Sequence, residues 1–419
     1  MKKKNKAIYL LFLMPFVYFA TACFVVWLVK TSGIYPSGSD TMYHVYRGDY
    51  VYNAIKSGNW YPLYDPAWYN GVEILRYWSP FPAYVMAFCQ YLAGGSQFGA
   101  YLFYIGGVCF LGACVWPFIG RGFNRPYLGA FIGLLWFFMP NNLCAIFIEG
   151  NLARSLSMIF LPVFIYSVYK YLYNHKLRYI PLMVFTFLLM ELCHLGYAGM
   201  VAIAVIIYGI VYMIQKGRKK AVLDVVISMI FGFMLLGIWL VASLRGGITS
   251  LDNSENMANF FQNLWITINP FERLTRGFEY FYFGFATLIV IVFGILFGYK
   301  KSRTGFVTGF IILLMTTKSA YAVLKHLPGS QYLWMLRFIS IALCMILMSF
   351  LMWDRLKKTL VLMLCVLLVV DTIPSLSLIV GEHNDISVQE RMAARQDSTL
   401  ISSAQAVTKQ RLALMDESI

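Results

Sequence analysis

Charged residues are scarce in this sequence: they make up 13% of its 419 positions, and only 19 residues are acidic. Soluble globular domains carry about a quarter of their residues as charges, so a soluble enzyme or binding domain is excluded. Instead, 60% of the residues are hydrophobic. They recur in runs of about twenty residues, the length that a helix needs to cross the hydrocarbon core of a bilayer. The composition predicts an all-α polytopic membrane protein.

Several catalytic motifs are also missing. The sequence contains no GxxxxGK[ST] loop, which argues against an ATP-driven pump, and no HExxH, GxSxG or EF-hand pattern. Its eight cysteines form no CxxC pair and lie in or beside apolar runs. They therefore predict neither a zinc site nor a disulfide framework.

The apolar runs indicate about eleven transmembrane helices. They are expected near residues 8–29, 97–119, 126–140, 152–172, 179–193, 197–214, 221–244, 281–298, 304–317, 332–353 and 359–376.

Basic residues give this arrangement an orientation. The net charge is +15, and 18 of the 34 Lys and Arg residues lie in six short segments that fall on alternate sides of the expected spans. By the positive-inside rule these segments are cytoplasmic, which predicts a cytoplasmic N-terminus and an external C-terminus in the plasma membrane. The basic charge then sets topology and requires no nucleic-acid partner. The six segments are residues 1–6, 121–125, 174–178, 215–220, 299–303 and 354–358.

Residues 1–376 are expected to form one transmembrane domain with a long first external loop at 30–96. Within this loop, residues 80–94 are apolar but too short to span, so they predict a helix in the membrane interface. The polar tail 377–419 resembles the beginning of a further external domain. Because the expected cytoplasmic connections are short and the external ones long, chemistry is expected on the outer face.

The first external loop opens with candidate catalytic residues. Asp40, His44 and Arg47 follow at i, i+4 and i+7, which places all three on one face of a helix that starts at residue 39 or 40. A carboxylate base, an imidazole and a phosphate-binding guanidinium would then share one patch. The alternative is that Asp40 only caps this helix, as Ser and Asp commonly do.

The same loop is rich in aromatic residues, with thirteen between positions 43 and 84. Trp60, Trp68 and Tyr69 are candidates for stacking on a sugar ring or a prenyl chain. Such residues also form the interfacial belt found in most membrane proteins, and that alternative stays open.

Three later segments place further ionisable residues at the expected outer ends of spans. Glu149 and Arg154 bracket the start of one span, where charge usually faces a cavity or a partner, although these two could also simply pair with each other. His194 ends another span and could equally be structural. Arg337, which follows several basic residues, could hold a lipid phosphate or serve as a headgroup anchor.

An anchor helix followed by a long aromatic loop that opens with Asp, and by an interfacial helix before the second span, resembles the GT-C glycosyltransferase superfamily. More closely, GSDTMYHVYRGDYVYNAIKSGNWYPLYDPAWYNG at 38–71 and YWSPFPAYVMA at 77–87 resemble bacterial membrane proteins labelled "6-pyruvoyl-tetrahydropterin synthase related", a label that implies no pterin chemistry. GT-C enzymes transfer a sugar from a polyprenyl-phosphate carrier to a glycan or protein acceptor on the outer leaflet.

The resemblance implies roles for individual residues. Asp40 would be the general base, and Arg47, Arg154 or Arg337 would bind the phosphate. The family's first loop often carries two adjacent acidic residues, whereas Asp40 is followed by a threonine. A second carboxylate would have to come from Asp49 or Glu149. Without an acidic pair, a divalent cation is not favoured as a cofactor.

The sequence thus predicts a GT-C-like membrane glycosyltransferase that uses a lipid-linked sugar donor on the external face. Two alternatives remain. A transporter or flippase for a lipid-linked glycan would place charged residues at mid-membrane depth, where this chain has few. A non-catalytic envelope assembly protein with the same fold would tolerate replacement of Asp40.

Overall fold

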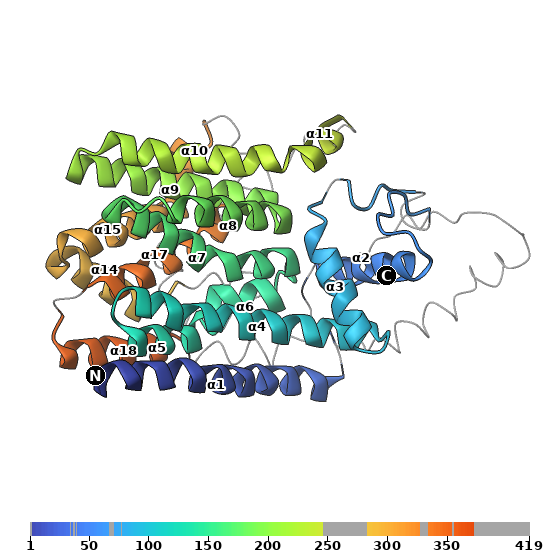
Figure 1. The fold of residues 1–419 in the computed structure, drawn as a ribbon, viewed down its shortest axis with the longest axis horizontal. Helices are drawn as coiled ribbons and strands as arrows, with labels where there is room; N and C mark the ends of the chain where they lie inside the picture. Colours follow the sequence, from blue (N-terminus) through green and yellow to red (C-terminus); the bar gives the residue numbers. More distant parts are fainter. Residues whose placement is uncertain are drawn as a thin grey trace, which may run out of the picture.

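The computed structural model describes residues 2–33, 35–36, 38, 40–66, 71–76, 78–245, 283–326, 334–353 and 356–372. Every regular element in these ranges is a helix. Long and short helices lie side by side in a bundle (Figure 1). They are α1 (Lys2–Ser32), α4 (Gln97–Gly122), α5 (Pro126–Trp136), α6 (Pro140–Phe147), α7 (Leu152–Asn174), α8 (Tyr179–Cys193), α9 (Leu195–Lys216), α10 (Lys219–Leu235), α11 (Gly237–Arg245), α14 (Phe285–Phe297), α15 (Lys300–Met315), α17 (Phe338–Met352) and α18 (Lys358–Thr372).

Local sequence explains several helix boundaries. Pro126 and Pro140 are the first residues of α5 and α6, where proline loses no helical hydrogen bond. The side chains of Ser96 and Asn151 accept backbone N–H groups at the starts of α4 and α7. Gly217 ends α9 with a left-handed backbone conformation, which turns the chain directly into α10.

The chain is a polytopic membrane protein. Among the described residues, five helices are long and apolar enough to cross a membrane, or seven if the two bent pairs α5–α6 and α10–α11 each count as one span. Helices occupy each of the eleven expected positions, but α8 and α14 are shorter apolar helices of 15 and 13 residues. The span expected at 126–140 is shorter in the structure, because α5 ends at Trp136 and proline-initiated α6 follows at a 40° angle beyond the expected end.

The basic connections between helices gather at one end of the bundle. Hydrogen bonds join residues in or next to three of these connections. The Tyr173 hydroxyl donates to the Lys301 carbonyl at 3.2 Å, and the Thr304 hydroxyl donates to Gln215 Oε1 at 2.5 Å. The N-terminus lies at this same end (Figure 1). The charge pattern therefore corresponds to a physical separation into a basic end and an opposite end.

The first loop folds as two helices at the opposite end, α2 (Thr41–Lys56) and α3 (Phe81–Leu92) (Figure 1). Both helices predicted there from the sequence are confirmed. Gly48 lets α2 approach α3 closely, since a Cβ at this position would lie 2.2 Å from Met86 Cγ. Gln90 on α3 also donates to Asp49 Oδ1 on α2 at 2.6 Å.

The two central helices of the bundle, α7 and α17, pack against each other. Their membrane-spanning windows are 83% and 89% buried, compared with 28% for α1. A short 3₁₀ turn, η3 (Met335–Arg337), precedes α17. Polar side chains at the starts of α7 and α17 are therefore enclosed by protein, and Arg154 and Arg337 occupy these positions.

Candidate functional site

The connection between α6 and α7 is where the first loop meets the bundle. Gly150 has a φ of +63°, in the left-handed region that favours glycine, and a Cβ there would lie 2.3 Å from Thr41 Oγ1. One residue earlier, the Glu149 carbonyl accepts a hydrogen bond from the Asp40 backbone N–H at 3.0 Å. The start of α2 is thus attached directly to the segment that leads into α7.

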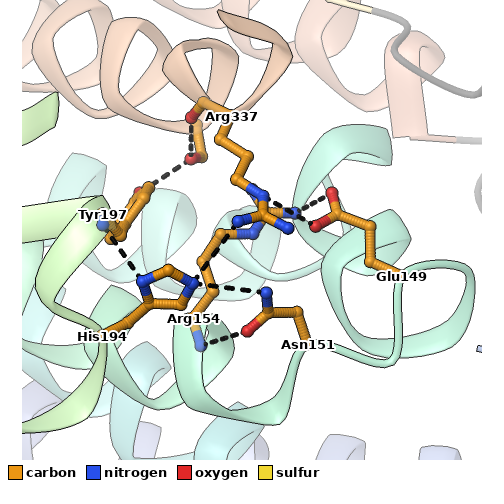
Figure 2. Close-up of polar contacts among 7 residues, drawn as sticks. Glu149, Asn151, Arg154, His194, Tyr197 and Arg337 are labelled. Carbon is orange, nitrogen blue, oxygen red and sulfur yellow. Dashed lines mark hydrogen bonds and ion pairs between the residues drawn. The ribbon is translucent and has the colours of Figure 1, made fainter. Parts of the chain in front are cut away.

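Glu149 joins two arginines that are far apart in the sequence (Figure 2). Its Oε1 accepts from Arg154 Nη2 at 2.5 Å, and its Oε2 accepts from Arg337 Nε at 3.2 Å. From the sequence alone, Glu149 and Arg154 could pair only with each other or face a further partner. The structure shows that they do pair and that Arg337 completes the group.

This group is buried and has an excess of cations. The Arg154 side chain is fully buried, and those of Glu149 and Arg337 are 12% and 13% exposed. Nε and Nη1 of Arg154 have no hydrogen-bond partner in the part of the chain that the structure describes. Because a buried donor without a partner costs about 1–3 kcal/mol, these two atoms favour an additional acceptor.

His194 lies beside the arginines, between α8 and α9. Its Nδ1 accepts the Tyr197 backbone N–H at 3.1 Å, while its Nε2 lies 3.4 Å from both Asn151 Nδ2 and Arg337 Nη1. Burial, together with the charges of Arg337 and Arg154, holds the pKa of His194 well below its ordinary value. The neutral ring has one proton, and because Nδ1 is an acceptor we assign that proton to Nε2.

With this assignment, His194 Nε2 and both of its neighbours, Asn151 Nδ2 and Arg337 Nη1, are hydrogen-bond donors. The Asn151 amide cannot be reversed without loss, because its Oδ1 accepts the Arg154 backbone N–H at 2.9 Å. The amide of Asn151 and the guanidinium of Arg337 therefore meet the Nε2–H of His194 as one group of donors (Figure 2). An anion with several oxygens would satisfy all three groups, as anions do at other sites built from convergent donors.

Asp40 and His44 bring the first loop to this cluster. Asp40 occupies the N-cap position of α2, but its side chain makes no capping hydrogen bond there. Its carboxylate lies within electrostatic range of Arg337. His44 lies within electrostatic range of His194, and burial, with a smaller effect of Arg47, lowers the pKa of His44 to about 3.

Arg47, by contrast, points to a different set of groups. Its Nη2 donates to the Trp78 carbonyl at 3.3 Å, and its guanidinium lies 5.4 Å from the Tyr43 ring centroid and 5.9 Å from that of Trp78. This cation–π environment fixes Arg47 between α2 and the segment before α3. The predicted helix is present, but the contacts identified for Arg47 are not with Glu149, Arg154 or His194.

The remaining predicted residues are also dispersed. Asp49 accepts a hydrogen bond from Gln90 and so joins α2 to α3. Trp60 has an exposed side chain, and its carbonyl accepts from the Tyr84 hydroxyl at 2.7 Å. Trp68 and Tyr69 lie outside the described residues.

Sequence reasoning missed Asn151, Tyr197 and Ser340. The Tyr197 hydroxyl lies 2.7 Å from Ser340 Oγ, which in turn donates to the Arg337 carbonyl at 3.0 Å (Figure 2). Together they hold the start of α17 against α9. The Gly-Asn pair before α7 was an available signal for Asn151, because this pair combines a left-handed residue with an N-cap. No sequence pattern links Tyr197 to Ser340.

A metal site is a separate question. Across the described ranges, no group of three or more His, Cys, Asp or Glu side chains is arranged to hold a metal ion. The donors that converge at the cluster are N–H groups, and these bind anions.

Comparisons with known proteins give one match. No curated protein and no solved structure matches this chain. A family model for the 6-pyruvoyl-tetrahydropterin synthase related domain, described as a membrane protein, matches residues 75–379. The matched region includes Glu149, Arg154, His194 and Arg337, whereas Asp40 precedes it. The chain therefore belongs to the family of membrane proteins with the 6-pyruvoyl-tetrahydropterin synthase related domain.

Proposed function

We propose that this protein is a GT-C-like membrane glycosyltransferase. It takes a sugar from a polyprenyl-phosphate carrier and transfers it to a glycan or protein acceptor of the cell envelope. All eleven predicted helices cross the plasma membrane, the basic end of the bundle is cytoplasmic, and the end that holds α2 and α3 is external.

The observation that supports this proposal best is the buried set of donors around His194 and Arg154. Arg154 Nε and Nη1 have no hydrogen-bond partner among the described residues. The donors Asn151 Nδ2 and Arg337 Nη1 both lie 3.4 Å from His194 Nε2, to which we assign the ring proton. A phosphate offers several acceptor oxygens and a charge opposite to that of the arginines. The donor's phosphate is therefore the group that fits this position.

Asp40 supplies the second requirement of the reaction, a base near the phosphate site. An acceptor hydroxyl attacks the anomeric carbon of the sugar, and its proton passes to the Asp40 carboxylate. The bond between the anomeric carbon and the phosphate oxygen breaks, and the polyprenyl phosphate leaves with the bonding electrons. Arg154 and Arg337 stabilise the charge that develops on this leaving group.

The test uses the full chain purified in mild detergent and loaded with a polyprenyl-phosphate hexose. Wild type, Asp40→Asn and the control Glu73→Gln are compared by native mass spectrometry, before and after an envelope acceptor fraction is added. Glu73 lies in the same loop but pairs with Arg76 outside the cluster. We expect all three proteins to retain the lipid, and only Asp40→Asn to fail to discharge its sugar.

Two results would contradict the proposal. If no variant retained the lipid, the convergent donors would have another ligand. If Asp40→Asn discharged the sugar as fast as wild type, Asp40 would not be the base. Movement of the lipid across vesicle membranes that is independent of Asp40 would instead favour a flippase.

A further inference from the structure

A second polar site lies at the basic end of the bundle, opposite the cluster around Glu149. A hollow of about 640 Å³ opens there between the end of α7 and the start of α10. It is lined by the backbone turn at Gly217 and by side chains of both helices and their connections. These are Tyr171, His175, Arg218, Lys219, Lys220, Ala221 and Asp224.

The hollow carries a net positive charge. Arg218, Lys219 and Lys220 contribute three cations, and Asp224 contributes the single carboxylate among the lining residues. The Tyr171 hydroxyl donates to Asp224 Oδ2 at 2.5 Å, which holds this carboxylate against α7. An anion that enters the hollow therefore meets an excess of Lys and Arg side chains.

An apolar stripe continues from the hollow along α10. Lys219, Leu223, Ile227 and Phe231 follow one another at intervals of four residues, which aligns them along one side of the helix. The last three side chains are exposed, and so face the hydrocarbon in a membrane-spanning helix. A molecule with a phosphate in the hollow could place its apolar chains on this stripe.

We propose that this hollow binds the headgroup of an anionic glycerophospholipid, with its acyl chains along α10. Charge complementarity selects the phosphate, and the adjoining stripe selects a lipid over free phosphate. Basic residues can set the orientation of a membrane protein without forming a hollow, so orientation alone does not account for this one. The site is independent of the proposed transferase, since none of its lining residues belongs to the cluster around Glu149.

Native mass spectrometry of the delipidated full chain tests this site with phosphatidylglycerol and phosphatidylcholine of matched acyl chains. We expect wild type to bind phosphatidylglycerol about tenfold more tightly, because each basic residue near a headgroup adds to its affinity. Arg218→Gln/Lys220→Gln should lose this preference. Lys301→Gln/Arg303→Gln removes the same charge from the same end of the bundle, outside the hollow, and should keep it.

Three outcomes would overturn the proposal. Equal binding of the two lipids by wild type does so without any substitution, so the test does not depend on the variants folding. Equal loss in both double variants would show non-specific attraction. Displacement of phosphatidylglycerol by an equal concentration of inorganic phosphate would show that the hollow takes free phosphate.

Discussion

Replacement of Glu149 by glutamine should destabilise the empty protein and increase the stabilisation that a phosphate ligand provides. The carboxylate contacts Arg154 at 2.5 Å and Arg337 at 3.2 Å, and its side chain is only 12% exposed. Solvent therefore screens it weakly. Removing one partner of a buried ion pair costs about 3–5 kcal/mol, because the remaining charge is left uncompensated. Glu149→Gln leaves the charges of two arginines uncompensated. We therefore expect the free energy of unfolding of the empty protein to fall by about 3–5 kcal/mol.

A phosphate ligand should restore much of what this substitution removes. Farnesyl phosphate presents the same phosphate monoester as a polyprenyl phosphate, and its anionic oxygens can take the place of the carboxylate. Thermal unfolding followed by tryptophan fluorescence should show a lower midpoint for Glu149→Gln than for wild type, and a larger rise when farnesyl phosphate is added. Glu73→Gln is the matched control, because its partly exposed pair with Arg76 is worth about 0–1 kcal/mol.

The reasoning fails if Glu149→Gln is as stable as wild type, since the carboxylate would then not balance the arginines. It also fails if farnesyl phosphate raises both midpoints equally. In that case the ligand would bind away from the two arginines that Glu149 contacts.

Three further predictions concern the first loop and the orientation. The folded-state pKa of His44 is about 3, below the ordinary value of 6.5, so the unfolded chain binds the extra proton between these values and stability should fall as pH falls through this window; a pH series of unfolding midpoints should be less steep for His44→Gln. Gly48→Ala should destabilise the contact of α2 with α3 by about 1–3 kcal/mol, because its Cβ would meet Met86, and should increase cleavage of the loop in limited proteolysis, whereas Gly107→Ala, in open space on α4, should not. A cysteine at Leu177, in the basic connection after α7, should react with an impermeant maleimide in inverted vesicles and not in intact cells, measured above the background of the parent chain; the reverse pattern would overturn the proposed orientation.

The fold was largely predictable because its signals are local. Apolar runs identify helices in a membrane protein, and the spacing of Asp40, His44 and Arg47 predicted α2 because the helical period depends only on neighbouring residues. The early end of α5 and the start of α6 at Pro140 were not predicted, although this proline is the last residue of the expected span. A proline indicates a break only when neighbouring helices allow the two pieces to diverge, and this depends on tertiary packing.

The site was less predictable because its contacts join distant segments. Arg154 and Arg337 are far apart in the sequence, yet both contact Glu149. Each residue was a candidate by its position near the end of an apolar run, but no pattern shows which candidates meet. Arg47 illustrates the same limit, because helical spacing gives its face and not the Trp78 carbonyl that it contacts.

Glu149 links the proposed base to the proposed phosphate site through two different parts of one residue. Its carbonyl holds the Asp40 backbone, while its carboxylate holds the arginines. The backbone here is tightly packed, since a Cβ on Gly150 would lie 2.3 Å from Thr41 Oγ1. A phosphate that binds the arginines beside this carboxylate therefore requires no movement of the main chain. The main chain, and with it Asp40, keeps its position, so the base is already in place when the donor binds.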